Sequence, residues 1–430
     1  MPLPLPAAVT VIGLDDTDSR DRGMCTTYVA DSVARRLAAA GAAVERVLLV
    51  RCNPAVEYKT RGNAALAVHT DADASTAADV ARTVVEAAAE TVDDRTNPGV
   101  VVGHGRPGAV PDPVVDFSRT AVTDHHIREN ARRVAEGADY RLETWKNGRG
   151  VIGALAAVGA WAAFDEWTYE HIAYRNPDRW GTARDVDGDS VFAAADAAYP
   201  SVWDTVDRGT GETVCVPRTP GPVLYGVRGD DPSDCRAAAA RIEGEAVERA
   251  RLFVTNQGTD AHLLDGDVPV AADGRSYRLD GTVASPPESR EGGHVFFGLA
   301  DGSSGIRCVA FEPTKRFRAH VRRLRVGDEV TVCGEVAAGT LKLEKFAVRG
   351  LCRVEAVTPT CPDCGRTMES AGSGQGYRCR DCGTAADGRV QRSIERTLQV
   401  GWYEVPPRAR RHVAKPLVRG GFDAPVHPER

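Results

Sequence analysis

Three carboxylates and several hydroxyls stand close together near the start of the chain, directly after an apolar run. The segment reads Gly13-Leu14-Asp15-Asp16-Thr17-Asp18-Ser19, and Gly23-Met24-Cys25-Thr26-Thr27-Tyr28 follows it. Oxygen ligands of this kind suit Mg²⁺, which proteins usually hold with one or two carboxylates while substrate phosphates complete its shell. The spacing therefore predicts a magnesium and phosphate site that uses Asp15, Asp16 and Asp18.

The flanking residues place this cluster on a loop between a strand and a helix. Val9 to Leu14 has the length and β-branched content of a buried strand, and the apolar residues from Val29 onward recur at every fourth position, as on one face of a helix. In open α/β sheets, ligands bind at this end of the strands. The alternative is a solvated Asx turn, with Thr26 or Thr27 as the N-cap of the helix.

Length and composition set the class of protein. A chain of 430 residues with 42% hydrophobic side chains predicts two to four globular domains. The longest apolar run, Val151 to Phe164, is too short to span a bilayer, and the N-terminus lacks the basic region of a signal peptide. We therefore expect a cytoplasmic protein with no membrane association. Its 11 cysteines fit a reducing compartment, because four of them form a metal pattern.

The N-terminal third alternates between strand and helix patterns, which predicts a mixed or parallel sheet. The strand candidates after the first are Arg46–Val50, Ala64–His69 and Val100–Gly103, and the helical segments are Ala30–Ala40 and Val80–Val92. A further helical stretch covers residues 124–138, and a second α/β unit is expected over about 139–270.

Residues 275–355 show a different pattern, five short strands with a helix after the third. This is the order of an OB-fold, a small barrel that binds oligonucleotides on one face. Phe296, Phe297 and Phe311 are candidates for base stacking, although alternation lets only one of the first two face outward, and core packing is the alternative for all three.

Two Cys-x-x-Cys pairs separated by fourteen residues follow the barrel. They are Cys361/Cys364 and Cys379/Cys382, and a glycine comes directly after each pair. Four thiolates at this spacing predict a tetrahedral zinc ribbon whose Zn²⁺ is structural, since no coordination position stays open. A redox pair and an iron–sulfur cluster are the alternatives. The basic segment 408–415 behind the ribbon either holds phosphates or is a solvated terminus.

Charge is unevenly distributed along the chain. The net charge is −6, yet residues 275–355 carry 14 basic and 10 acidic residues and residues 356–430 carry 12 and 8, which leaves −14 for residues 1–274. The C-terminal part is therefore the expected contact for a polyanion.

Two glycine-containing basic motifs extend the predicted phosphate site. One contains Lys59, Arg61, Gly62 and Asn63, and the other contains Gly103, His104 and Arg106. Glycines let a backbone approach phosphate and the cationic side chains neutralise it. Together they outline a nucleotide site without a Walker or Rossmann fingerprint, although plain turns are the alternative for each.

These motifs, together with TYEHIAYR (residues 168–175) and TNQGTDAHL (residues 255–263), make the chain similar to the archaeal tRNA(Ile) 2-agmatinylcytidine synthetase family. The resemblance covers nearly the whole chain. It implies a multidomain fold, α/β and α+β: an ATP-binding kinase-like α/β domain (1–138), a ferredoxin-like domain (139–274), an OB-fold β-barrel (275–355), and a Cys₄ zinc ribbon with a basic tail (356–430).

The resemblance further implies a ligase that forms a C–N bond between agmatine and C2 of the wobble cytidine of an isoleucine tRNA, so that its CAU anticodon reads AUA. ATP is converted to AMP and pyrophosphate, with Mg²⁺ at the catalytic site and Zn²⁺ in the ribbon. The catalytic residues it implies are Asp15, Asp16, Asp18 and Thr26, where Thr26 matches a threonine that becomes phosphorylated in the family. A non-catalytic single-stranded nucleic-acid-binding protein remains the alternative, because a barrel and a ribbon suffice for that role.

Overall fold

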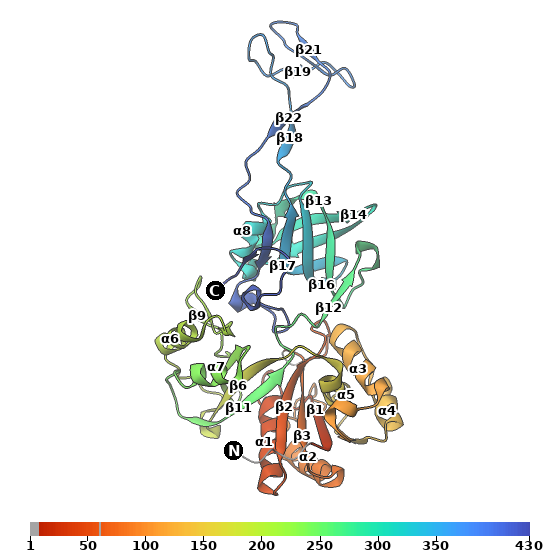
Figure 1. Cartoon of the computed structure of the whole chain (residues 1–430), viewed down its shortest axis with the longest axis vertical. Coiled ribbons are helices and arrows are strands. Elements are labelled where there is room, and N and C mark those ends of the chain that lie inside the picture. The colour runs from red at the N-terminus through yellow and green to blue at the C-terminus, as the bar shows by residue number, and fades with distance from the viewer. Residues whose placement is uncertain (1–7, 60–61) are drawn as a thin grey trace.

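The protein has an α/β body, a β-barrel above it, and a small ribbon held away from both on a two-stranded stalk (Figure 1). The structure is a computed structural model, and it describes residues 8–59 and 62–430. None of the helices in these two ranges is long and apolar enough to cross a membrane.

A single nine-stranded sheet runs through the α/β body. Its order is β5-β4-β1-β3-β2-β11-β6-β10-β7. The strands are β1 (Thr10–Asp15), β2 (Val44–Arg51), β3 (Ala64–Thr70), β4 (Gly99–His104), β5 (Arg141–Thr144), β6 (Thr168–Arg175), β7 (Val202–Trp203), β10 (Val223–Gly229) and β11 (Val247–Thr255). The short pair β8 (Val206–Asp207) and β9 (Glu212–Thr213) lies outside it.

Helices cover both faces of the sheet because its central strands are apolar on both sides. The helices of the body are α1 (Thr26–Ala39), α2 (Ala74–Ala88), α3 (Asp112–Thr123), α4 (Arg128–Gly137), α5 (Val151–Ala163), α6 (Gly188–Ala198) and α7 (Pro232–Ala239). Leu37 of α1 packs in one core with Ile12 and Leu14, whereas Leu155 of α5 shares the opposite core with Val11.

The sequence predicted either a mixed or a parallel sheet. The sheet is mixed, and most of its strand pairs are antiparallel. β1 lies between β3 and β4 and is antiparallel to both, and β2 joins β11 as a parallel pair. β5 and α5 complete the first unit, since β5 pairs with β4 and α5 packs on β1. The sheet thus continues past the predicted boundary at residue 138. Helix α3, with prolines on either side of Asp112, was not expected from the sequence.

The barrel forms from the five strands expected in residues 275–355. They are β13 (Ser276–Ser289), β14 (Val295–Asp301), β15 (Ser304–Ala310), β16 (Glu329–Ala337) and β17 (Thr340–Gly350), with the one-turn α8 (Phe317–Val321) between β15 and β16. The barrel closes because β16 pairs with both β13 and β17 while β15 pairs with β17. β12 (Leu263–Gly266) adds to β13 at the side nearest the body.

The stalk consists of β18 (Val354–Val357) paired with β22 (Val390–Ser393). Between them lies the three-stranded ribbon of β19 (Glu369–Ser370), β20 (Tyr377–Arg378) and β21 (Ala385–Ala386). In Figure 1 this ribbon stands at the far end of the molecule from the N-terminal helices. It is therefore reachable by a large partner without passing the body.

The chain then returns to the barrel and to the body beneath it. β23 (Gly401–Glu404) pairs with the barrel strand β17, and β24 (Val426–His427) pairs with β23. Between them the Arg410 side chain is 3% exposed and pairs with Asp204 and Glu404, and Arg411 pairs with Glu344 at 3.1 Å. The prediction of a phosphate-binding or solvated segment at 408–415 is therefore wrong for these two arginines, because carboxylates of the barrel and the body neutralise them.

Candidate active site

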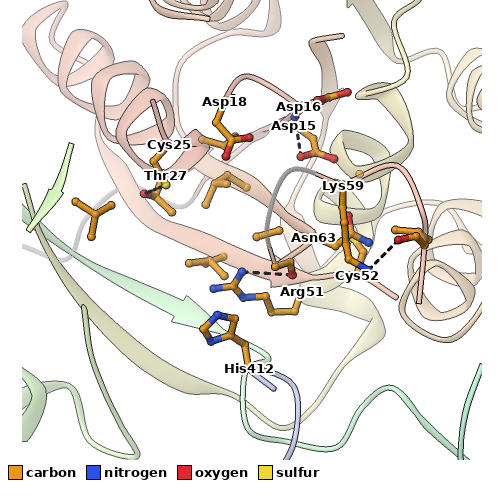
Figure 2. A pocket seen from close by; sticks show the side chains of 18 of the residues that line it. Asp15, Asp16, Asp18, Cys25, Thr27, Arg51, Cys52, Lys59, Asn63 and His412 are labelled. Carbon is orange, nitrogen blue, oxygen red and sulfur yellow. Dashed lines mark hydrogen bonds between the residues drawn. The ribbon is translucent and has the colours of Figure 1, made fainter. Parts of the chain in front are cut away.

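The α/β body has two units: the first contains β1 to β5 and α1 to α5, and the second contains β6 to β11 with α6 and α7. A cavity of about 690 Å³ lies where these two units meet. Its wall combines the loop after β1, the end of β2, parts of β6 and β10, and one residue of the C-terminal segment. Figure 2 shows the three aspartates of the first loop on one side and Arg51 with His412 on the other. This volume is in the range of pockets that bind nucleotide-sized ligands.

Asp15 is the last residue of β1, and its carboxylate packs against the first turn of α5. A Cβ at Gly153 would lie 2.0 Å from Asp15 Oδ2, so only glycine at this helix position admits the carboxylate. The Asp16 backbone N–H donates to Asp15 Oδ1 at 2.7 Å. Burial, followed by the charge of Asp16, raises the pKa of Asp15 well above its usual value. A cation is the partner that favours such a carboxylate in its ionised form.

Asp16 occupies the left-handed region with φ 60°, which aspartate tolerates better than most residues. Its Oδ2 accepts from the Arg149 guanidinium at 2.8 Å, and burial raises its pKa in spite of that pair. Within the described residues, the four ribbon cysteines are the sole group of three or more side chains that converge as metal ligands. The two neighbouring aspartates still fit Mg²⁺, which commonly takes one or two protein carboxylates.

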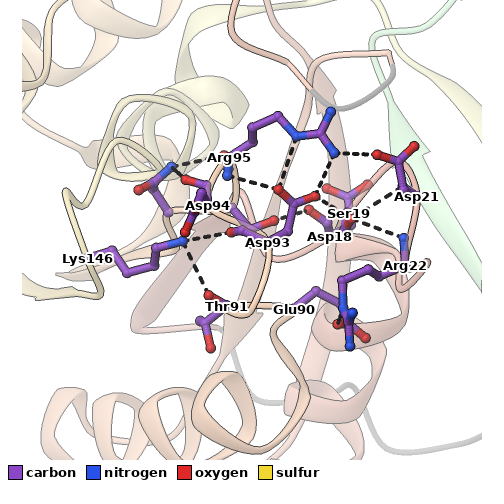
Figure 3. A network of polar contacts seen from close by, with 12 residues as sticks. Asp18, Ser19, Asp21, Arg22, Glu90, Thr91, Asp93, Asp94, Arg95 and Lys146 are labelled. Atoms are coloured by element: carbon purple, nitrogen blue, oxygen red, sulfur yellow. Dashed lines mark hydrogen bonds and ion pairs between the residues drawn. The ribbon is translucent and has the colours of Figure 1, made fainter.

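A second loop, residues 90–97, holds the acidic loop in place (Figure 3). Ser19 Oγ donates to Asp93 Oδ2 at 2.5 Å, and Arg95 bridges Asp93 and Asp21. Asp18 is 8% exposed, and its backbone carbonyl accepts from Thr96 Oγ1 at 2.8 Å. These contacts fix the direction of the loop before any ligand binds.

Thr26 and Thr27 are the first two residues of α1, and both line the cavity. The Thr17 hydroxyl donates to Thr26 Oγ1 at 3.1 Å, while Thr27 Oγ1 lies 3.0 Å from Cys25 Sγ. Neither threonine caps the helix, because the N-cap is Cys25 and it makes no side-chain capping bond. The threonine N-cap of the alternative interpretation is therefore wrong.

The first basic motif reaches the cavity. Lys59, Gly62 and Asn63 line it, and Arg61 lies outside the described residues. Lys59 Nζ donates to the Val56 carbonyl at 2.8 Å, and burial lowers its pKa. Asn63 has φ 47° and donates to the Asn53 carbonyl at 2.7 Å, which shapes the turn into β3.

The second basic motif does not reach the cavity. β4 runs antiparallel to β1, so Gly99 lies opposite Asp15 while His104 lies opposite Thr10 at the far end. Gly103 instead makes room for Tyr140, whose ring would be 2.9 Å from a Cβ there, and Arg106 is exposed. The expectation that Gly103, His104 and Arg106 join the acidic loop is therefore corrected by the strand direction.

Several polar residues of the cavity were not identified from the sequence, among them Arg51, Glu170, Arg228 and His412. Two of them carry a signal in the sequence that could have pointed to the site. Glu170 belongs to the TYEHIAYR motif, and Arg51 is the last residue of β2. His412 lies in the basic segment 408–415, for which phosphate binding was one of the two predictions, but nothing in the sequence joins that segment to this cavity. Nothing local marks Arg228, near the end of β10.

The four cysteines of the ribbon come together as predicted. Their sulfur atoms all lie within 4.8 Å of one another, although Cys364 and Cys382 are exposed. The two knuckles have the same turn: the N–H of Gly365 donates to the Cys361 carbonyl and that of Gly383 to the Cys379 carbonyl, each at 2.9 Å. Both glycines have φ 72°, a conformation that favours glycine. This geometry fits one tetrahedral ion.

Neighbouring aromatic side chains of the barrel point to opposite faces of their strand, as the alternation of side chains along a strand requires. Phe297 is 2% exposed in the barrel core, while the ring of Phe296 lies outside it, 4.7 Å from the Arg290 guanidinium. Phe311 is 37% exposed. Phe296 and Phe311 therefore remain candidates for base stacking, and Phe297 is excluded.

Together, the fold and the site define a class of protein: a nucleic-acid-binding type of barrel and a Cys₄ ribbon joined to an α/β body with a polar cavity. Domain families match each part: the TiaS TCKD domain over residues 11–72, the TiaS FLD domain over 148–262, an OB-fold nucleic acid binding domain over 277–344, and the TiaS C-terminal zinc ribbon domain over 358–398.

Full-length relatives extend this match. The tRNA(Ile) 2-agmatinylcytidine synthetase TiaS of Haloquadratum walsbyi is 52% identical, with 98% of this chain and all of that protein covered. The crystal structure of TiaS in complex with its isoleucine tRNA and ATP is 41% identical at a TM-score of 0.88, and that of TiaS with the tRNA, AMPCPP and agmatine is 39% identical at 0.86. Each covers 98% of this chain and is itself fully covered. The chain belongs to the tRNA(Ile) 2-agmatinylcytidine synthetase (TiaS) family.

Proposed function

We propose that this chain uses ATP to attach agmatine to C2 of the wobble cytidine of the isoleucine tRNA with a CAU anticodon, which changes decoding from AUG to AUA. Family membership over the full length supports the reaction. The observation that carries it is the cavity that opens between the first and second units with the acidic loop in its wall. A binding protein without catalysis has no use for such a cavity.

The acidic loop is the proposed catalytic element. Asp15 and Asp16 would hold Mg²⁺, which when bound neutralises phosphate charge as phosphoryl transfer requires. Asp18 lies beside them, and Thr26 presents its hydroxyl to the same cavity as the proposed phosphate acceptor. Lys59, Gly62 and Asn63 form the proposed ATP-binding turn on the neighbouring strand end, and Arg61 belongs to the same motif. ATP is converted to AMP and pyrophosphate.

The barrel and the ribbon are proposed to hold the tRNA. Cys361, Cys364, Cys379 and Cys382 would keep a Zn²⁺ that stabilises the ribbon, because four thiolates fill its tetrahedral shell. The target cytidine must leave its stack to reach a cavity in the body, as is general for enzymes that modify a base. Phe311 offers an exposed ring and Phe296 a half-buried one on which neighbouring bases can stack.

The direct test is a reaction with defined components. Purified protein is incubated with Mg-ATP, agmatine and an isoleucine tRNA transcript with a CAU anticodon, and the digested nucleosides are measured by mass spectrometry. We expect a cytidine heavier by one agmatine, with none formed when ATP is omitted. Unmodified cytidine despite tight tRNA binding would contradict the proposal and favour a binding protein.

A further inference from the structure

The cavity wall that faces the acidic loop is basic, and three distant segments build it. Arg51 comes from the end of β2, Arg228 from β10, and His412 from the C-terminal segment between β23 and β24. All three line the cavity. In Figure 2, Arg51 and His412 lie next to each other and away from Asp15 and Asp18. The cavity therefore has an acidic side and a basic side.

The charges on the basic side do not balance. Glu170 pairs with Arg228 at 3.2 Å, and its other oxygen accepts from Gln257 at 2.5 Å. Arg51 donates to Gln257 Oε1 at 3.0 Å and to the Gly62 carbonyl at 3.4 Å. Within residues 8–59 and 62–430, no carboxylate lies in ion-pair range of the Arg51 guanidinium. Two guanidinium groups thus share a single carboxylate.

The surroundings agree with an excess of positive potential on this side. Burial lowers the pKa of Arg51 to about 10, and Arg228 adds to the lowering while Glu170 opposes it. The His412 ring faces the same cavity beside Arg51. A guanidinium that is half-buried in a cavity wall with no carboxylate in ion-pair range favours an anionic ligand.

Phosphate is the anion that fits. A guanidinium presents a planar fork of donors that matches phosphate oxygens, and an imidazole adds one further N–H. Agmatine, a dication, would be repelled by the two guanidinium groups. We propose that Arg51, Arg228 and His412 form a phosphate-binding site that holds a substrate phosphate across the cavity from the acidic loop. The inference rests on the proposed function, which supplies two sources: the polyphosphate of ATP and the backbone phosphate of the target nucleotide.

The test measures binding of each source separately on the full chain. Arg51→Gln removes a guanidinium charge, and its control is Arg82→Gln, which removes the same charge from the surface of α2. His412→Gln removes the imidazole N–H. ATP affinity is measured by titration calorimetry without tRNA, and tRNA affinity by filter binding without ATP. We expect one of the two affinities to fall about tenfold or more in Arg51→Gln, as loss of one charge-assisted hydrogen bond implies, and less in His412→Gln. Arg82→Gln should leave both unchanged.

The affinity that falls identifies the source of the phosphate. Arg51→Lys keeps the charge without the fork, so it should recover part of the loss. If Arg51→Gln fails to fold, His412→Gln and Arg51→Lys decide in the same assays. Folded variants whose ATP and tRNA affinities both stay within twofold of the unmodified chain would overturn the proposal. These are binding measurements, so they remain informative even if the unmodified chain forms no agmatinylcytidine.

Discussion

Individual carboxylates of the acidic loop have different surroundings in spite of their adjacency. Asp15 is enclosed by β1 and α5. Asp16 has a positive φ, and its carboxylate forms an ion pair with Arg149. Arg149 NH2 also donates to the Arg95 carbonyl at 2.7 Å, which connects Asp16 to the second loop. The charge of Asp16 is therefore positioned from both sides.

The charge of Asp16 can be removed with little change in shape. Asn also tolerates the left-handed region, so Asp16→Asn should fold normally. We expect ATP turnover to fall about 100-fold, the size typical for loss of one electrostatic group at a reacting centre, with tRNA affinity within twofold of the unmodified chain. Asp94→Asn, on the supporting loop, is the matched control. Turnover that survives in Asp16→Asn would remove this residue from the proposed catalytic set.

The sequence identified candidate site residues only where they are contiguous. The three aspartates and the four cysteines stand in short motifs, so their types and spacing were sufficient. Arg51, Arg228 and His412 come together only through the pairing of β2, β11, β6 and β10 and the return of the C-terminal segment. Gly103 and His104 were grouped with the acidic loop because strand direction cannot be read from an apolar strand.

Strands and turns of the second unit are tied together by one buried ion pair. Arg175, at the end of β6, is 1% exposed in its side chain and meets Glu245 Oε1 at 2.6 Å. Its guanidinium also donates to the Thr182 and Ala183 carbonyls, and the Asp185 N–H donates to Glu245. The pair thus joins β6, the turn that follows it and the start of β11. The sequence placed β6 only within a second α/β unit and the TYEHIAYR motif, and neither could show what secures the end of the strand.

This pair predicts a loss of stability in acid. The hydrogen bond from Arg175 lowers the pKa of Glu245 to about 2. A carboxyl whose folded-state pKa is depressed contributes stability that is complete above its unfolded value of about 4.5 and is lost as pH falls toward 2. Glu245→Gln should lower the free energy of unfolding by about 3 kcal/mol at pH 7, since it leaves Arg175 buried without its partner.

Thermal or urea unfolding at pH 7 and at pH 3 measures both effects. The difference between Glu245→Gln and the unmodified chain should shrink at pH 3. Glu243→Gln, in the same turn but without an ion pair to a described residue, is the control. A difference that is equal at both pH values would contradict the assigned ionisation.

The whole molecule is held together by its last thirty residues, which follow the ribbon in sequence but return to the body. Asp204, Glu344 and Glu335 are neutralised by Arg410 and Arg411. Asp260, in the TNQGTDAHL motif, accepts from the Lys415 N–H at 2.7 Å, and His262 of that motif lies 3.1 Å from Glu344. This motif therefore connects the body, the barrel and the C-terminal segment, a role that composition and periodicity could not reveal.

The role of the ribbon can be tested only if the returning segment is kept. Val357 and Val390 are cross-strand partners in the stalk, so a two-residue Asn-Gly turn can replace residues 358–389 without strain. We expect this variant to fold and to bind ATP within twofold of the full chain, because the cavity and His412 are untouched. Its affinity for tRNA should fall at least tenfold, since the ribbon stands far from the body and is available to a large partner (Figure 1).

Truncation after residue 355 should behave differently. It removes Arg410 and Arg411 along with the ribbon and leaves buried carboxylates without partners, at a cost of about 3 kcal/mol for each broken pair. We expect a lower thermal midpoint and weaker ATP binding as well as weaker tRNA binding. Calorimetry and filter binding on the two variants separate these effects. Unchanged tRNA affinity in the turn variant would show that the ribbon does not contact the tRNA, and an equal loss of ATP affinity in both would show that the ribbon and the cavity do not act independently.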